Sequence, residues 1–264
     1  MLRWTLYLLL AATIGCAEAQ PESAAPRPVD SIRTVLHTVL LGDSTVTLAV
    51  HEKPGGVLNA LVLHDDENTA VEAGLAFIEA DGGRLVDLQA QGNRNVAFAL
   101  DGQAYRFDPN RMFSRVGIRR TLEAQSTYTP AAAAAVRAFA DSVLAVFAPE
   151  GVVVTLHNNT PDRYSALSYT PDGEYADDAA AVFLQPEGDP DDFFFATDLA
   201  LYTALAEDGF NTVLQNNASV TDDGSLSVLA AAYGWPYVNV EAEHGHHDHQ
   251  RAMLAALVRL LATD

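Results

Sequence analysis

Val57-Leu58-Asn59-Ala60-Leu61-Val62-Leu63-His64-Asp65-Asp66-Glu67 is the stretch of sequence that decides the fold. Its first seven residues are almost all apolar, which is typical of a strand buried on both faces of a parallel sheet. The polar residues begin directly after this run, where the strand is expected to end. A second apolar run, Val152–Leu156, is likewise followed by a histidine, His157. We therefore expect two buried strands whose carboxyl ends carry polar side chains.

Strand patterns and helix patterns alternate along the remainder of the chain. Further strands are predicted at residues 45–50, 84–89, 96–100, 103–107, 212–214 and 237–240, and helices at residues 69–80, 130–147, 191–208, 225–233 and 250–262. Asp101-Gly102 predicts a hairpin turn between two of these strands, and Thr129-Pro130 predicts the start of a helix. This alternation predicts a single α/β domain, with a mostly parallel or mixed central sheet and helices on both faces. Ligands of such sheets bind beyond the carboxyl ends of the strands.

The first residues are expected to direct export. Arg3 precedes an apolar segment that is too short for a permanent membrane span, and Cys16 follows it. We expect residues 1–16 to hold a lipoprotein-type signal, with Cys16 as the lipidated first mature residue. Cleavage after Ala19, which would give a secreted protein, is the alternative. Residues 17–30 are expected to form a flexible tether, and residues 31–264 the folded domain. Cys16 is the only cysteine, so no internal disulfide is possible.

The chain is strongly acidic. It has 15 Lys and Arg residues against 35 Asp and Glu residues, which gives a formal net charge of −20, and Lys53 is its single lysine. Such a charge argues against binding to nucleic acid or to an anionic membrane surface, because both would repel it. We therefore expect membrane contact only through the lipidated N-terminus.

Four motifs whose side chains could take part in catalysis or binding lie at or near the ends of predicted strands. They are His64-x-x-Glu67, Asp108-Pro109-Asn110-Arg111, His157 and Glu241. Two histidines and a carboxylate are the ligands of a catalytic zinc site with an open fourth position. An arginine fork binds a carboxylate through two parallel hydrogen bonds, which a lysine cannot do. A further glutamate suits a general base. Together the motifs predict metal-assisted chemistry on a ligand that bears a carboxylate.

In this order, the motifs resemble those of the zinc metallocarboxypeptidase superfamily, which includes the succinylglutamate desuccinylase/aspartoacylase branch. The resemblance covers residues 57–245. It implies a metallocarboxypeptidase-like α/β fold and one Zn²⁺ ion bound by His64, Glu67 and His157. It also implies that Asp108 accepts a hydrogen bond from His64 and fixes the orientation of that ring.

The resemblance further implies roles for residues around the metal. Asn110 and Arg111 would grip the terminal carboxylate of the substrate. Arg94 would polarise the scissile carbonyl and stabilise the oxyanion, with Arg84 as the alternative. Asn158 and Asn159 are expected to line the pocket beside His157, although turn formation would explain both residues equally well.

Glu241 is the predicted general base and general acid. It would take a proton from the attacking water and pass it to the leaving amine. Glu243 is the alternative, and the register of the strand decides between them. We choose Glu241 because the strand at residues 237–240 leads directly into it.

A histidine-rich tract, Glu243-His244-Gly245-His246-His247-Asp248-His249, follows and departs from the superfamily pattern. Such a tract can bind metal by composition alone. Three interpretations stay open here: a solvated loop, a second metal site, or a part of the active-site wall.

Other catalytic classes find no support in the sequence. It contains no Gly-x-Ser-x-Gly motif and no phosphate-binding Gly-rich loop, and Cys16 lies in the predicted signal. We therefore interpret the chain as an exported zinc hydrolase that cleaves an amide bond next to a carboxylate-bearing group, with small peptides as substrates. A zinc deacylase of N-acyl amino acids and a non-catalytic protein that binds metal and a carboxylate are the alternatives.

Overall fold

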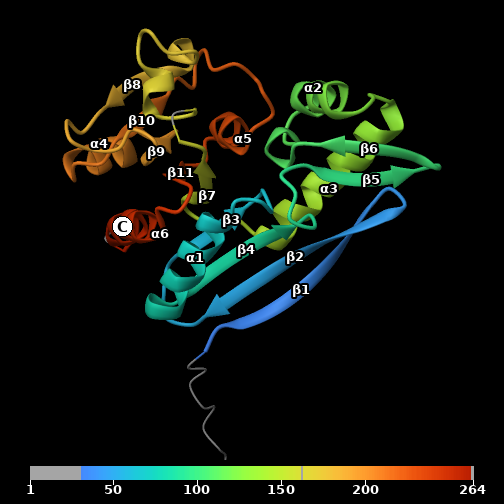
Figure 1. The fold of residues 1–264 in the computed structure, drawn as a ribbon, viewed down its shortest axis with the longest axis horizontal. Coiled ribbons are helices and arrows are strands. Elements are labelled where there is room, and N and C mark those ends of the chain that lie inside the picture. The colour runs from blue at the N-terminus through green and yellow to red at the C-terminus, as the bar shows by residue number, and fades with distance from the viewer. Residues whose placement is uncertain (1–30, 162, 263–264) are drawn as a thin grey trace, which may run out of the picture.

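The computed structural model describes residues 31–161 and 163–262 (Figure 1). Its strands are β1 (Arg33–Leu41), β2 (Ser44–Lys53), β3 (Asn59–Val62), β4 (Gly83–Gln89), β5 (Val96–Leu100), β6 (Gln103–Phe107), β7 (Val153–Asn159), β8 (Ala179–Phe183), β9 (Phe193–Ala196), β10 (Thr212–Gln215) and β11 (Tyr237–Glu243). Its α-helices are α1 (Asn68–Asp81), α2 (Arg115–Gln125), α3 (Pro130–Phe147), α4 (Leu199–Glu207), α5 (Leu226–Tyr233) and α6 (His247–Leu261), and its short 3₁₀ helices are η1 (Pro109–Arg111), η2 (Ala166–Tyr169) and η3 (Ala176–Asp178). The predicted signal with Cys16 and the tether at 17–30 lie outside the described residues.

A mixed sheet of nine strands, all within the described ranges, organises the fold in the order β1-β2-β4-β3-β7-β11-β9-β10-β8. Its central strands β4, β3, β7 and β11 run parallel, whereas β1, β2 and β8 pair antiparallel. β3 and β7 are the two apolar runs of the sequence, and nearly all of their residues are buried. Because these two strands are direct parallel neighbours, the residues at their carboxyl ends lie at the same end of the sheet.

Helices cover both faces of the sheet (Figure 1). α1 and α6 pack together in one hydrophobic cluster, whose members include Phe77, Ile78, Met253, Leu254 and Leu257. α3 and α5 belong to the other cluster, whose members include Val136, Phe139, Val143, Phe147 and Leu226. α3 is long and apolar enough to cross a membrane by length and composition alone, but its apolar residues in this cluster pack inside the folded domain.

The predicted fold class is confirmed: the described residues form an α/β domain with a mixed central sheet and helices on both faces. The hairpin is also present, since β5 and β6 pair across Asp101 and Gly102, which have left-handed φ values of 51° and 76°. Thr129 caps α3 by accepting a hydrogen bond from the backbone of Ala132 at 3.0 Å. β1, α2 and β8 were not predicted.

One predicted element is wrong. The sequence pattern predicted a helix over residues 191–208, but Phe193–Ala196 form strand β9 between β11 and β10. All four residues of β9 are buried, so the three phenylalanines pack in the core as part of the sheet. The helix α4 begins only at Leu199, because Asp198 accepts hydrogen bonds from the backbone of Ala200 and Leu201 and caps it there.

Candidate metal centre

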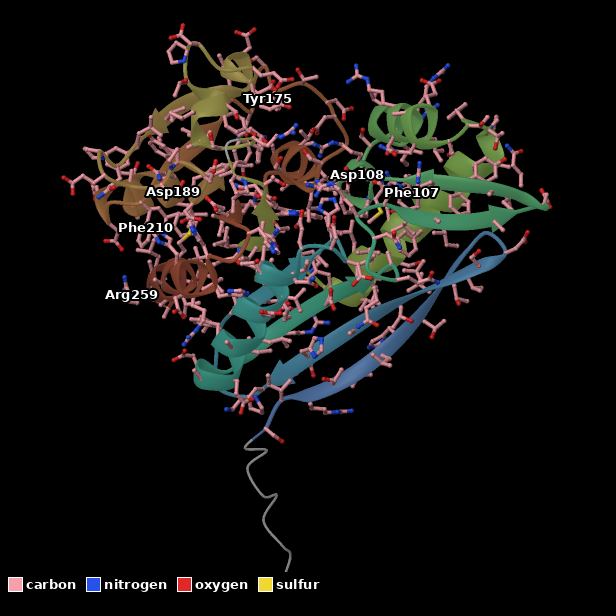
Figure 2. All side chains as sticks on the ribbon, viewed as in Figure 1. Phe107, Asp108, Tyr175, Asp189, Phe210 and Arg259 are labelled. Atoms are coloured by element: carbon pink, nitrogen blue, oxygen red, sulfur yellow. The ribbon has the colours of Figure 1, made fainter. Side chains whose placement is uncertain are left out.

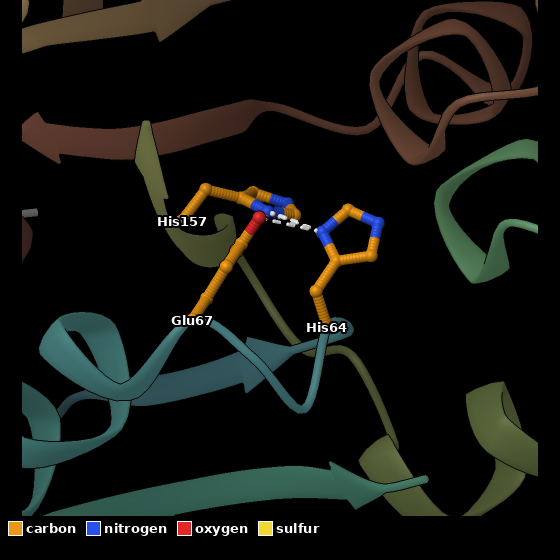
Figure 3. A group of neighbouring side chains, drawn as sticks. All are labelled: His64, Glu67 and His157. Carbon is orange, nitrogen blue, oxygen red and sulfur yellow. Dashed lines mark hydrogen bonds and ion pairs between the residues drawn. The ribbon is translucent and has the colours of Figure 1, made fainter. Parts of the chain in front are cut away.

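His64, Glu67 and His157 are brought together at the carboxyl ends of β3 and β7 (Figure 3). All three are buried, with exposed fractions of 1%, 3% and 4%. The carboxylate of Glu67 lies between the two rings. Its Oε1 is 2.7 Å from Nδ1 of His64, and its Oε2 is 2.7 Å from Nδ1 of His157. The two Nδ1 atoms are themselves 3.3 Å apart, so the three predicted ligands point at one another.

This group can hold a metal ion. One ligand atom from each of the three residues lies within 4.8 Å of the other two. Two imidazole nitrogens that face each other at 3.3 Å repel through their lone pairs unless a proton or a cation lies near both. Nε2 of His157 is buried and has no hydrogen-bond partner among the described residues. The polar contacts of the His157 ring therefore all lie on its Nδ1 side. The ligand set of two imidazoles and one carboxylate matches that of catalytic zinc.

The electrostatics of the group favour positive charge at its centre. Burial alone would lower the pKa of His64, but the carboxylates of Glu67 and Asp108 raise it to about 9. Burial alone would raise the pKa of Glu67, but His64 and His157 hold it well below its usual range. Glu67 is therefore ionised. A divalent cation binds such a group by replacing the proton on the histidine.

Asp108 contacts the other nitrogen of His64. It lies between β6 and η1 (Figure 2), and its Oδ1 is 2.8 Å from Nε2 of His64. The same oxygen accepts a hydrogen bond from the backbone N–H of Asn110 at 2.8 Å, which fixes the carboxylate in place. Because Nε2 donates to Asp108, Nδ1 of His64 is the nitrogen left to bind a metal.

Glu241 lies beside this group in β11. It is the ladder partner of His157 in β7, and only 4% of it is exposed. Asn239 donates a hydrogen bond to its Oε2 at 2.9 Å. Burial, with the nearby charge of Glu67, raises the pKa of Glu241 to about 8. Glu243, the alternative base, is less buried, and its Oε1 lies 3.9 Å from Nε2 of His246.

Arg94 reaches the group from the loop after β4. Its Nη1 donates to Oε1 of Glu67 at 2.8 Å, and 49% of its side chain is exposed. Asp65 holds this loop, because its Oδ2 accepts hydrogen bonds from two backbone N–H groups there at 2.6 Å each. Because about half of this side chain is exposed whereas His64, Glu67 and His157 are buried, the guanidinium lies on the solvent side of the three predicted ligands.

Asn110 and Arg111 lie in η1, directly after Asp108. Nη1 of Arg111 donates to the backbone oxygen of Asn110 at 2.7 Å and lies 3.3 Å from Oδ2 of Asp223. The side chain of Arg111 is 38% exposed. Sequence reasoning missed Asp223, since this residue lies far along the chain and no local pattern links it to the arginine. A substrate carboxylate that binds Arg111 would compete with Asp223 for the guanidinium.

Two residues that the sequence analysis considered are not brought to the group. Asn158 was expected to line the pocket, but its Oδ1 accepts a hydrogen bond from the backbone of Ala70 at 3.4 Å. Neighbouring residues in a strand point to opposite faces of the sheet, so Asn158 faces away from His157. Arg84, the alternative to Arg94, lies at the start of β4 and donates to the backbone oxygen of Phe147 at 2.8 Å, at the opposite end of the sheet.

No family model matches the chain, and no curated protein matches it in sequence. Its fold is similar to solved structures. A murein-tripeptide amidase from Escherichia coli O157 has 16% identity and a TM-score of 0.46, with 90% of this chain and 96% of that chain covered. An aspartoacylase family protein from Mesorhizobium loti has 16% identity and a TM-score of 0.44, with coverage of 86% and 67%. A succinylglutamate desuccinylase/aspartoacylase from Rhodobacter sphaeroides has 12% identity and a TM-score of 0.44, with coverage of 88% and 66%.

Proposed function

We propose that this protein is a zinc-dependent hydrolase that cleaves an amide bond next to a carboxylate-bearing group. The observation that carries the proposal is the buried convergence of His64, Glu67 and His157, with Asp108 bonded to the far nitrogen of His64. A carboxylate that orients a ligand histidine in this way is typical of metal sites, because it fixes the tautomer and makes the ring a stronger ligand.

His64, Glu67 and His157 would hold the ion, which supplies Lewis-acid polarisation of the scissile carbonyl and activation of a water molecule when it is bound. Glu241 would accept a proton from that water and donate it to the leaving amine. Asn239 holds Oε2 of Glu241, so that Oε1 is the oxygen left for the proton. The same carboxyl group must both take and release a proton during one turnover near neutral pH.

The arginines would position the substrate. Arg111 would bind the substrate carboxylate, since its guanidinium is partly exposed and lies in the short helix that follows Asp108. Asp223 beside it would favour substrates whose terminal residue carries a positively charged side chain in addition to the carboxylate. Arg94 would lie near the scissile carbonyl, because it already contacts the metal ligand Glu67. Small peptides with a free carboxylate fit these features.

A substrate panel tests the proposal. The zinc-loaded protein is given peptides with a free terminal carboxylate, the same peptides as terminal amides, and N-acyl amino acids. We expect release of the terminal residue from the free acids, and at least tenfold slower release from the amides, because an amide cannot pair with Arg111. Hydrolysis confined to the N-acyl amino acids would make the protein a deacylase. Binding of the free acids without any hydrolysis would make it a non-catalytic binding protein.

We also propose that the protein is exported and lipidated at Cys16. Metabolic labelling with a radioactive or clickable fatty acid should mark the wild-type chain and leave Cys16→Ser unlabelled, because the thiol is the only acceptor that a lipoprotein signal provides. As a control, the wild-type and Cys16→Ser proteins must be present in equal total amounts. Equal labelling of both, or labelling of neither, removes the anchor, and cleavage after Ala19 would then be the alternative to examine by N-terminal sequencing.

A further inference from the structure

The histidine-rich tract forms a second cluster of possible metal ligands, away from the site described above. Asp189, Glu243 and His246 each offer a ligand atom, and these three atoms lie within 4.8 Å of one another. Glu243 is the last residue of β11, and His246 precedes the first turn of α6. Asp189 lies in the loop between β8 and β9, and Figure 2 shows it well apart from Asp108.

Asp192 orients His246 within this cluster. Its side chain is almost fully buried, and its Oδ2 is 2.9 Å from Nδ1 of His246. Its Oδ1 accepts a hydrogen bond from the backbone N–H of Glu243 at 2.7 Å. One carboxylate therefore holds both ends of the turn from Glu243 to His246. With Nδ1 engaged, Nε2 of His246 is the nitrogen left on the side of Glu243, whose Oε1 is 3.9 Å away. This repeats the relation between Asp108 and His64, in which a carboxylate on one ring nitrogen leaves the other nitrogen for a metal.

A buried acceptor that has no partner within the described ranges lies beside Glu243 in the sheet. Asn159 is the ladder partner of Glu243, and only 7% of it is exposed. Its Nδ2 donates to the backbone oxygen of Asp191 at 2.7 Å, which turns the side chain towards the loop that carries Asp189. Its Oδ1 has no hydrogen-bond partner among the described residues. A buried amide oxygen costs free energy unless a water, a proton donor or a cation satisfies it.

Among the described residues, neither arginine nor lysine balances the charge of the cluster. In the part of the chain that the structure describes, the ion pairs of Asp192 and Glu243 are made with histidines only, namely His246 and His249. Asp189, Asp192 and His246 line a surface hollow of about 840 Å³. Carboxylates gathered around an imidazole at such a hollow attract a divalent cation.

We propose that Asp189, Glu243 and His246 bind a second divalent cation, with Asp192 as the residue that orients the histidine. The mixed set of two carboxylates and one imidazole suits Zn²⁺ better than Ca²⁺ or Mg²⁺, which prefer oxygen ligands alone. The ion would tie the loop between β8 and β9 to the turn between β11 and α6. It would thereby brace the end of β11, two residues beyond Glu241.

Zinc content at a buffered free Zn²⁺ concentration tests this site separately from the first. We expect two equivalents in the wild type and one in each of Asp189→Asn, His246→Asn and His64→Ala. The double variant His64→Ala/His246→Asn should hold none. The two asparagine changes are chosen to keep the fold: Asn at 189 keeps the oxygen that accepts from the backbone of Asp191, and Asn at 246 is a good residue at a helix N-terminus.

His247→Asn is the matched control, because both ring nitrogens of His247 already have partners, Nε2 in Glu72 and Nδ1 in the backbone oxygen of Gly245. It should keep both equivalents. The proposal is wrong if the wild type holds a single equivalent that His64→Ala removes, or if Asp189→Asn and His246→Asn keep both. It is also wrong if His247→Asn loses as much zinc as His246→Asn, since the tract would then bind by composition alone.

A thermal measurement guards against loss of folding. In the His64→Ala background, added Zn²⁺ should raise the melting temperature, and the rise should vanish when His246→Asn is combined with it. Equal rises in both backgrounds would overturn the proposal even if every variant folds. Ca²⁺ at the same concentration should produce a smaller rise than Zn²⁺, and an equal or larger rise with Ca²⁺ would contradict the choice of metal.

Discussion

His64→Ala and His157→Ala are each expected to remove one equivalent of tightly bound zinc and to leave the domain folded. Each change deletes one of the two imidazoles that face each other across Glu67, and a carboxylate with a single histidine is a much weaker zinc site. The domain should stay folded because the two hydrophobic clusters on either side of the sheet do not depend on these side chains. Metal analysis of the purified variants, together with circular dichroism, measures both results.

A cost in stability is expected beside the loss of metal. His64→Ala leaves the buried carboxylates of Glu67 and Asp108 without one of their partners, which should lower the free energy of unfolding by about 1–3 kcal/mol. His51→Ala is the control, because His51 lies on β2 and bonds to Thr34 on the neighbouring edge strand. This control should keep its full zinc content. Full zinc in both His64→Ala and His157→Ala would contradict the assignment of the ligands.

Much of the fold and of the central group follows from features that are local in the sequence. β3 and β7 are continuous apolar runs, and each is followed or ended by polar residues, so the sequence indicates where these strands stop. Parallel pairing of two such strands then brings His64 and His157 to one end of the sheet. The turn at Asp101-Gly102 and the cap at Thr129 are equally local, and both are present in the structure.

What could not be predicted depends on contacts between distant segments. Phe193-Phe194-Phe195 suits a buried helix face as well as a strand, and only the space between β11 and β10 decides for a strand. Asp223 lies in the loop before α5 and contacts Arg111, and no spacing in the sequence predicts this contact. Asn158 is a different case, because strand alternation alone should have placed it on the face opposite to His157.

Glu241→Gln is expected to lower kcat by two or more orders of magnitude, with zinc content and KM close to those of the wild type. The amide of Gln cannot take the proton that the carboxylate takes, and general acid–base groups contribute this much to rates. The fold should tolerate the change, because Gln has the size of Glu and its amide oxygen can still accept the hydrogen bond from Asn239. Steady-state kinetics on the best free-acid peptide of the panel, with metal analysis of the same samples, measures the effect.

Arg111→Ala provides the contrast that makes this test specific. A carboxylate clamp holds the substrate in the ground state and in the transition state alike, so its loss should mainly raise KM and change kcat little. The two variants must therefore differ in kind, one in turnover and the other in binding. If Glu241→Gln keeps near-normal turnover while Glu243→Gln is inactive, the base is Glu243. Because the side chain of Glu243 lies beside His246 whereas Glu241 is the ladder partner of His157, we expect the reverse: Glu243→Gln should turn over substrate far faster than Glu241→Gln.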